Sequence, residues 1–207
     1  MKKTLILASL AAALMLGGCA SDSALSAVSE TSFDEVLSSR RSIRSYDATK
    51  TISESEVREL LLATQNAPSW ANVQPSKYYV ALSQEKIAAV QELIGENNKK
   101  NVQGAPVLIV STFEKGKSGF FSGNAINEVG DGWGAYDNGL SNAYLILKAR
   151  AMGFDTLIMG MRDSEGLRSV FNIPSGEAVM AVISLGYRAG EPRIPAHRDL
   201  DEIVRFF

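Results

Sequence analysis

Arg40-Arg41-Ser42-Ile43-Arg44-Ser45-Tyr46 is the stretch of this sequence with the most specific chemistry. Its three guanidiniums and a serine hydroxyl, all within five residues, can bind a phosphate through charge-assisted and partly bidentate hydrogen bonds. A basic turn exposed to solvent would explain the same heptapeptide equally well. The stretch by itself therefore leaves a phosphate site and a solvated turn as equal alternatives.

A second stretch, Ala67-Pro68-Ser69-Trp70-Ala71-Asn72-Val73-Gln74-Pro75-Ser76, favours the phosphate site. It places amide and hydroxyl side chains beside an aromatic ring, in a loop with a proline near each end. Such groups can bind the hydrogen-bonding edge of a heterocycle. Together the two stretches indicate a ligand that carries both a phosphate and a heterocycle.

Other kinds of active site find little support in the sequence. The only histidine is His197 and the only cysteine is Cys19, so no metal-ligand set stands out. His197 lies near the C-terminus, and no G-x-S-x-G segment supplies a serine nucleophile for it. No G-x-G-x-x-G joins a strand to a helix, which argues against a Rossmann unit. Demanding chemistry would therefore have to come from an organic cofactor.

Strands that alternate with helices indicate the fold class. Ser32-Phe33-Asp34-Glu35 and Ser53-Glu54-Ser55-Glu56 are capping boxes, so each predicts the start of a helix. The pattern then predicts strands at 78–82, 107–111, 155–159 and 179–185, helices at 84–94 and 135–152, and a helix capped by Asp163. We expect one α/β or α+β domain with a central sheet.

A glycine-rich loop and a long helix lie in the middle of the chain. Residues 114–134 interleave six glycines with Phe120, Phe121 and Trp133, and a loop of this length is usually functional or disordered. Residues 135–152 predict a core helix that ends at Gly153. The apolar residues that suggest a core position are Leu140, Ala143, Tyr144, Leu147 and Ala151.

The N-terminus resembles an export signal of the bacterial lipoprotein type. Lys2 and Lys3 precede the apolar run Thr4–Leu16, which is shorter than the roughly 20 residues that a membrane-spanning helix needs. The run leads into Leu16-Gly17-Gly18-Cys19, which resembles a lipobox, where the cysteine thiol receives a diacylglyceryl group. An ordinary secretory signal, or a cytosolic protein with an apolar N-terminus, are the alternatives.

These features predict three segments and an exported protein. The segments are a signal peptide at 1–18, a flexible Ser- and Ala-rich tether at 19–32, and a domain at 33–207. Lipidation of Cys19 would anchor the protein to a membrane, on the periplasmic face or the cell surface of a bacterium. With 21 basic and 23 acidic residues, the chain has no basic footprint for nucleic acid.

The two opening stretches resemble the nitroreductase family of FMN-dependent oxidoreductases, which begins with R-R-S-x-R and continues, after one helix, with A-P-S-x-x-N-x-Q-P-W. The likeness runs in the family's order over about residues 33–205. It includes Tyr136-Asp137-Asn138-Gly139, Gly153-Phe154-Asp155-Thr156, Ile158-Met159-Gly160, Leu185-Gly186-Tyr187 and His197-Arg198-Asp199-Leu200-Asp201-Glu202. The resemblance implies an α+β fold, a three-layer α/β sandwich whose central, mainly antiparallel sheet is flanked by helices. It also implies a homodimer with flavins at its interface.

The resemblance further implies which residues bind FMN. Arg40, Arg41 and Ser42 would hold the phosphate and ribityl oxygens, and Arg44 would lie near flavin N1 and O2. The other implied contacts are Ser69, Trp70, Asn72 and Gln74 from the partner subunit, Met159 and Gly160 near N5, His197 or Arg198 at the phosphate and, on a looser alignment, Asn97 and Lys100. Ser76 replaces a usual Trp and Met159 a frequent Glu or Gly, and both replacements should alter the pocket walls.

The implied activity is a two-electron, ping-pong reduction of nitroaromatics, quinones or similar acceptors through flavin N5. NAD(P)H would be the donor, and no catalytic side chain is predicted because the flavin does the chemistry. The alternatives are an FMN-binding or scavenging lipoprotein without turnover, and a specialised flavin-fold enzyme of the dehalogenase or flavin-destructase type. If the protein is exported, the electron donor is the least certain part of this activity, since NAD(P)H is not expected in quantity beyond the cytoplasmic membrane.

Overall fold

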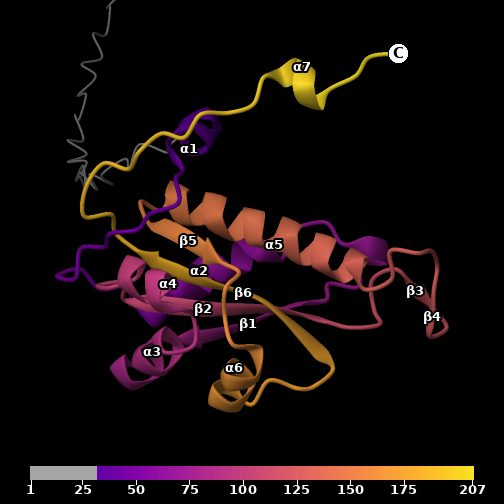
Figure 1. Cartoon of the computed structure of the whole chain (residues 1–207), viewed down its shortest axis with the longest axis horizontal. Helices are drawn as coiled ribbons and strands as arrows, with labels where there is room; N and C mark the ends of the chain where they lie inside the picture. Colours follow the sequence, from indigo (N-terminus) through magenta and orange to yellow (C-terminus); the bar gives the residue numbers. More distant parts are fainter. Residues whose placement is uncertain (1–31) are drawn as a thin grey trace, which may run out of the picture. The chain divides into compact units, whose positions relative to one another are not determined.

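The computed structural model describes residues 32–207, so the predicted signal peptide, Cys19 and nearly all of the predicted tether lie outside the described residues. In chain order the elements are α1 (Phe33–Ser39), α2 (Glu54–Thr64), the 3₁₀ turn η1 (Trp70–Asn72), β1 (Ser76–Ala81), α3 (Gln84–Gln91), α4 (Glu96–Asn101), β2 (Val107–Glu114), β3 (Phe120–Phe121), β4 (Asn124–Ala125), α5 (Gly132–Ala151), β5 (Asp155–Met159), α6 (Ser164–Phe171), β6 (Glu177–Gly186) and α7 (Leu200–Ile203) (Figure 1). None of these helices is both long and apolar enough to cross a membrane.

A four-stranded antiparallel sheet forms the centre of the fold, with its strands in the order β1-β2-β6-β5. β2 pairs along its whole length with β6, from Val107 opposite Leu185 to Glu114 opposite Glu177. A separate short hairpin precedes α5, and each of its strands, β3 and β4, has two residues. The α+β class and the mainly antiparallel sheet that we expected are confirmed.

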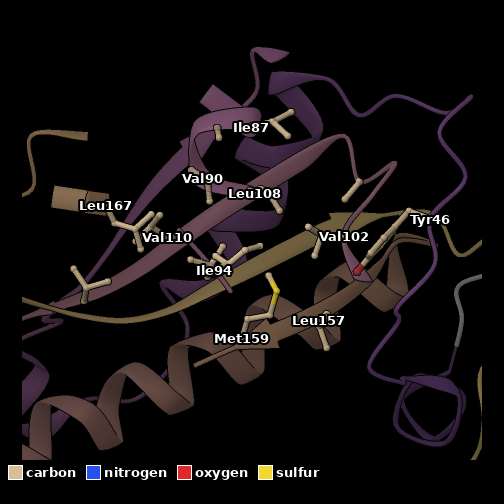
Figure 2. Close-up of a cluster of buried hydrophobic side chains, with 14 of the residues drawn as sticks. Tyr46, Ile87, Val90, Ile94, Val102, Leu108, Val110, Leu157, Met159 and Leu167 are labelled. Carbon is tan, nitrogen blue, oxygen red and sulfur yellow. The ribbon is translucent and has the colours of Figure 1, made fainter. Parts of the chain in front are cut away.

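Helices cover both faces of the sheet because the buried strands are apolar on both sides. Leu108 and Val110 of β2 point into a cluster with residues of α3 and α6 and with Val102, directly after α4, shown in Figure 2. The alternate residues, Val107 and Ile109, point into a second cluster with α2 and α5. The result is the expected three-layer sandwich of helices, sheet and helices.

The helix starts that capping residues predict are confirmed. Ser32 and Ser53 each form a complete capping box, with Glu35 and Glu56 as the reciprocal partners. The Asp163 carboxylate accepts hydrogen bonds from the first backbone amides of α6. Hydrogen bonds from Ser32 and Ser53 lower the pKa of Glu35 and of Glu56.

Element boundaries differ from the prediction where the sequence carries no apolar period. The polar helix α4, Glu96–Asn101, was not predicted, because its residues give no apolar stripe to read. β2 continues past Ser111 to Glu114 because Thr112 is buried and hydrogen-bonded to Glu177. The predicted loop at 114–134 contains the β3–β4 hairpin and the first turn of α5.

The predicted core face of α5 was wrong. The residues that α5 buries in its own chain are Gly134, Asp137, Asn138, Ser141, Asn142, Leu145 and Ala149. Of the apolar residues that we expected in the core, Leu140, Ala143 and Leu147 are only half-buried, and Tyr144 and Ala151 are exposed. The first half of this helix is therefore buried through hydrogen-bonded polar side chains.

Candidate functional site

The Arg40–Tyr46 stretch is held in an extended form against the edge strand β5. The backbone N–H of Ile43 donates to the Thr156 carbonyl at 3.0 Å, and Ser42 forms an isolated parallel bridge with the same threonine. Ile43 is buried in the core, so alternation turns the side chains of Ser42 and Arg44 outward. Edge pairing thus presents the hydroxyl and guanidinium on the surface.

A cavity of about 410 Å³ lies over this stretch. Its lining is Arg40, Arg41, Ser42, Arg44, Arg193, Pro195 and Ala196. Four guanidiniums and one hydroxyl face the cavity, and no carboxylate belongs to its lining. Guanidiniums in such a set can bind a phosphate dianion through several charge-assisted hydrogen bonds.

Arg193 is the member of this lining that the sequence analysis missed. It lies in the chain after β6, between Pro192 and Pro195, and no regular element or motif marks it. His197 and Arg198, predicted to complete the phosphate site, follow the cavity lining in the same segment and are exposed. The basic C-terminal segment was the available signal, and it did not distinguish among these three residues.

The Ser69–Gln74 loop forms a second surface, between α2, β1 and α5. A cavity of about 410 Å³ lies here, lined by Leu61, Thr64, Gln65, Ala67, Pro68, Ser69, Gln74, Pro75, Ser76, Lys77, Tyr78, Asp137 and Ser141. Ala71, Asn72 and Gln74 have φ values of 44°, 57° and 50°, a left-handed conformation that non-glycine residues rarely adopt. Strained backbone of this kind clusters at ligand sites.

Tyr78 supports the floor of this second cavity from β1. Its hydroxyl donates to Ser141 Oγ at 2.7 Å and lies 3.1 Å from Asn142 Oδ1, both on α5. Burial raises the pKa of Tyr78 to about 12, so the phenol stays neutral at physiological pH. Tyr78 therefore acts as a hydrogen-bond donor here.

Met159 is the last residue of β5 and Gly160 follows it, and the two differ in exposure. The Met159 side chain is packed in the core (Figure 2), so only its backbone is available to a ligand and it alters no pocket wall. Gly160 is exposed. The helix α4, which carries the exposed Asn97 and Lys100, reaches this edge through Asn98, whose amide donates to the Met161 carbonyl at 3.4 Å.

The β3–β4 hairpin brings aromatic residues to the N-terminal end of α5. Phe121 is 74% exposed, whereas Trp133 is half-buried, with its ring 5.9 Å from that of Tyr136. The Trp133 Nε1–H donates to Asn127 Oδ1 at 3.1 Å, which fixes the indole beneath the hairpin.

The two predicted binding stretches lie at opposite ends of the sheet. Thr156, which pairs with Ser42, is opposite Leu185 and thus at the Val107 end of β2. The Ser69–Gln74 loop leads into β1 at the Glu114 end. Seven residues of β2 separate these ends, which corresponds to roughly 23 Å.

Among residues 32–207, no group of three or more histidine, cysteine or acidic side chains could hold a metal ion. The fold and the cavity over Arg40–Arg44 define a class: an α+β protein with a helix–sheet–helix sandwich and an arginine-lined cavity that can accept a phosphorylated ligand.

The chain belongs to the nitroreductase family, whose model matches residues 37–187. One relative is YdgI of Bacillus subtilis, provisionally named an NAD(P)H nitroreductase. It is 27% identical over 203 residues, covering 84% of this chain and 97% of that protein. A protein named NADH dehydrogenase from Thermus thermophilus is 28% identical over 190 residues, covering 80% and 91%.

A solved structure with the same fold comes from Exiguobacterium sibiricum, a provisionally named nitroreductase in complex with FMN. It superposes with a TM-score of 0.76 at 22% sequence identity, covering 86% of this chain and 98% of that one. The family membership and this shared fold confirm the resemblance that the two opening stretches carry.

Proposed function

We propose that this chain is an FMN-dependent oxidoreductase that reduces nitroaromatics, quinones or similar small acceptors in a two-electron, ping-pong cycle. The observation that carries the proposal is the cavity lined by four guanidiniums in a chain of the nitroreductase family. The FMN in the Exiguobacterium structure supports the cofactor. The names of YdgI and of the Thermus protein support NAD(P)H as the donor.

In the proposed complex, the phosphate site is built by Arg40, Arg41, Ser42 and Arg193. Arg44 supplies a fixed cation near flavin N1 and O2, where it stabilises the negative charge of the reduced ring. Bound FMN supplies the two-electron chemistry at N5. The chain's own residues bind and orient it, and none has to act as general acid or base.

We also propose that the enzyme is a homodimer in which the Ser69–Gln74 loop of each chain lies against the flavin held by its partner. The separation of about 23 Å along β2 supports this arrangement, because two copies can join stretches that one chain holds apart. An apolar groove on α1, α2 and α5 supports it further; its lining includes the exposed Phe33 and Tyr144. Members of this family are typically homodimeric.

Mixed dimers test the composite site. Arg41→Ala damages the phosphate side and Asn72→Ala the loop side, so each variant alone should lose FMN. When the two are unfolded together and reassembled, every mixed dimer has one intact site and one doubly damaged site. Random pairing then restores about a quarter of the wild-type FMN sites. If mixing restores no FMN although each variant is folded and dimeric, the site is not shared between chains.

We propose, finally, that Cys19 is lipidated and that the enzyme works beyond the cytoplasmic membrane. The support is the Leu16-Gly17-Gly18-Cys19 sequence after a short apolar run. NAD(P)H is scarce in such a location, so a membrane-derived or other small reductant would have to deliver the electrons there. Labelled fatty acid incorporated into wild-type protein but not into Cys19→Ala tests the anchor.

The decisive experiment on the cofactor is the spectrum of purified Ala20–Phe207. We expect a yellow protein that absorbs near 450 nm and releases FMN on denaturation. Anaerobic bleaching by NAD(P)H, followed by reoxidation with a nitroaromatic or quinone, would support the oxidoreductase. A colourless protein that does not take up FMN would refute the proposal. Tight FMN without turnover of any acceptor would indicate an FMN-binding protein instead.

A further inference from the structure

Asp137 is a buried carboxylate, 3% exposed, on the inner face of α5. One oxygen, Oδ2, accepts hydrogen bonds from two segments that are distant in the sequence. The backbone N–H of Trp70 donates to it at 3.0 Å, and the Ser118 hydroxyl donates at 2.6 Å. Trp70 begins the turn η1, and Ser118 lies two residues before β3 of the hairpin.

The Trp70 contact lies where the loop most needs support. The loop's three residues with positive φ, at positions 71, 72 and 74, come within four residues after Trp70. Within the loop, Gln74 N–H donates to Ser69 Oγ at 3.0 Å, and the Gln74 amide donates to Asn72 Oδ1 at 3.0 Å. Such a backbone persists only when its surroundings over-determine it. Asp137 fixes the Trp70 end of the loop to α5.

The Ser118 contact fixes the hairpin in the same way. Ser118 is buried, and the next residue, Gly119, packs so closely on Trp133 that an added Cβ would lie 2.4 Å from the indole Cδ1. Gly119 also accepts the Ile126 N–H at 2.9 Å, which closes the hairpin. The base of the hairpin is therefore attached to the first turns of α5 at two neighbouring points.

Asn138, the next residue of α5, holds the far end of the same loop. Its Nδ2 donates to Ser76 Oγ at 3.1 Å and to the Thr112 carbonyl at 2.9 Å, where β1 begins beside β2. Consecutive buried polar residues of one helix thus hold the loop at Trp70 and at Ser76. Of the two, only Asp137 also contacts the hairpin segment.

We propose that Asp137 is a positioning residue that couples the Ser69–Gln74 loop to the β3–β4 hairpin, so that the flavin-facing loop and the aromatic hairpin beside it keep one common arrangement. The inference rests on the proposed function for its catalytic meaning. The two hydrogen bonds that Asp137 accepts, from Trp70 and from Ser118, hold both segments to α5, and we call this arrangement the clamp. The clamp is a property of this chain, and it can be measured without FMN.

Amide hydrogen exchange of the purified protein, with and without FMN, measures the clamp. Asp137→Ala should speed exchange about tenfold or more in both 69–76 and 115–126, because each segment loses a hydrogen bond to a charged group. Asp137→Asn, whose amide oxygen can occupy the Oδ2 position, should restore most of the protection. Ser118→Ala should speed exchange in the hairpin much more than in the loop.

Ser141→Ala is the matched control. Ser141 is buried one turn further along α5, lines the cavity at the Ser69–Gln74 loop and accepts a hydrogen bond from the Tyr78 hydroxyl, but its side chain makes no hydrogen bond to either segment. Its variant should leave exchange in 69–76 and 115–126 at the wild-type values. FMN affinity should fall about tenfold in Asp137→Ala and recover in Asp137→Asn.

The outcomes separate this inference from the proposed function. If exchange at 69–76 is the same in Asp137→Ala as in wild type, there is no clamp, whatever the colour of the protein. If the wild type takes up no FMN but the exchange pattern is as described, the clamp stands and the proposed function fails. If the clamp opens and the FMN affinity of Asp137→Ala is unchanged, Asp137 has only a structural role.

Discussion

Asp155→Ala should destabilise the fold more than any other single loss of an ion pair in the described part of the chain. Asp155 begins β5, and its side chain is 2% exposed. Its two oxygens accept a bidentate pair from Arg188, at 2.8 Å from Nε and 2.6 Å from Nη2, and Arg150 Nη1 lies 3.5 Å away. The hydrogen bond with Asp155 raises the pKa of Arg188. One carboxylate thus joins the end of α5, the edge strand and the segment after β6.

The magnitude follows from the burial of the partners. Removing one member of a buried ion pair costs about 3–5 kcal/mol, because the other charge is left uncompensated. The Arg188 and Arg150 side chains keep some contact with water, at 17% and 25% exposed, which places the expected loss near the lower limit. A loss of about 3 kcal/mol corresponds to a fall in Tm of roughly 6–12 °C for a domain of this size.

Urea unfolding followed by circular dichroism measures this loss, and Glu59→Gln provides the comparison. Glu59 also joins distant segments, through Lys148 at 2.8 Å, but its side chain is 58% exposed. Its pair should contribute less than about 1 kcal/mol and weaken with salt, whereas the Asp155 pair should be nearly insensitive to salt. Equal losses in the two variants would refute the reasoning, because burial would then not decide the strength of the pair.

Three further predictions concern the site and its support. Arg44→Ala should lower the two-electron potential of bound FMN more than it weakens FMN binding, whereas Arg41→Ala should mainly weaken binding; equal losses of FMN with an unchanged potential would contradict the assignment. Tyr78→Phe should flatten the stability profile between pH 10 and about 12, because a raised pKa gives stability that is present below pH 10 and lost as the pH rises through the folded value. Absorbance of phenolate at 295 nm during urea unfolding measures this. Gly134→Ala should cost about 1–3 kcal/mol in thermal unfolding, because its Cβ would lie 2.4 Å from the buried ring of Phe113.

Local signals were sufficient for much of the fold. A capping box is complete within four residues, so Ser32 and Ser53 marked their helices correctly. The strand at 155–159 was predicted with its observed bounds, because a short buried run is visible without its neighbours. The sequence did not show α4 or the β3–β4 hairpin, since polar short elements are held by tertiary contacts rather than by a period of their own.

The candidate site was predictable only as separate stretches. The Arg40–Arg44 cluster is recognisable because its charges are adjacent in the sequence, and the structure places them around one cavity. Arg193 joins them from a segment about 150 residues later, a proximity that no local pattern encodes. Asp137 lies in Tyr136-Asp137-Asn138-Gly139, one of the segments that carry the family resemblance. Its hydrogen bonds with Trp70 and Ser118, however, depend on how three segments of the chain pack together, which the sequence does not show.

The error over α5 is informative about assembly. Sequence analysis assigned Tyr144, Leu147 and Ala151 to the core because apolar residues normally face inward. In the single chain these residues line an outer groove instead, while hydrogen-bonded polar groups fill the inner face of the first half of the helix. A helix that also has apolar side chains on its outer side is stabilised further when another surface covers that side and removes those side chains from water. A second copy of the chain, which we propose independently because the binding stretches lie at two ends of the sheet, would cover it. The apolar pattern of α5 is then consistent with burial, with the partner subunit rather than the chain's own sheet as the surface that buries it.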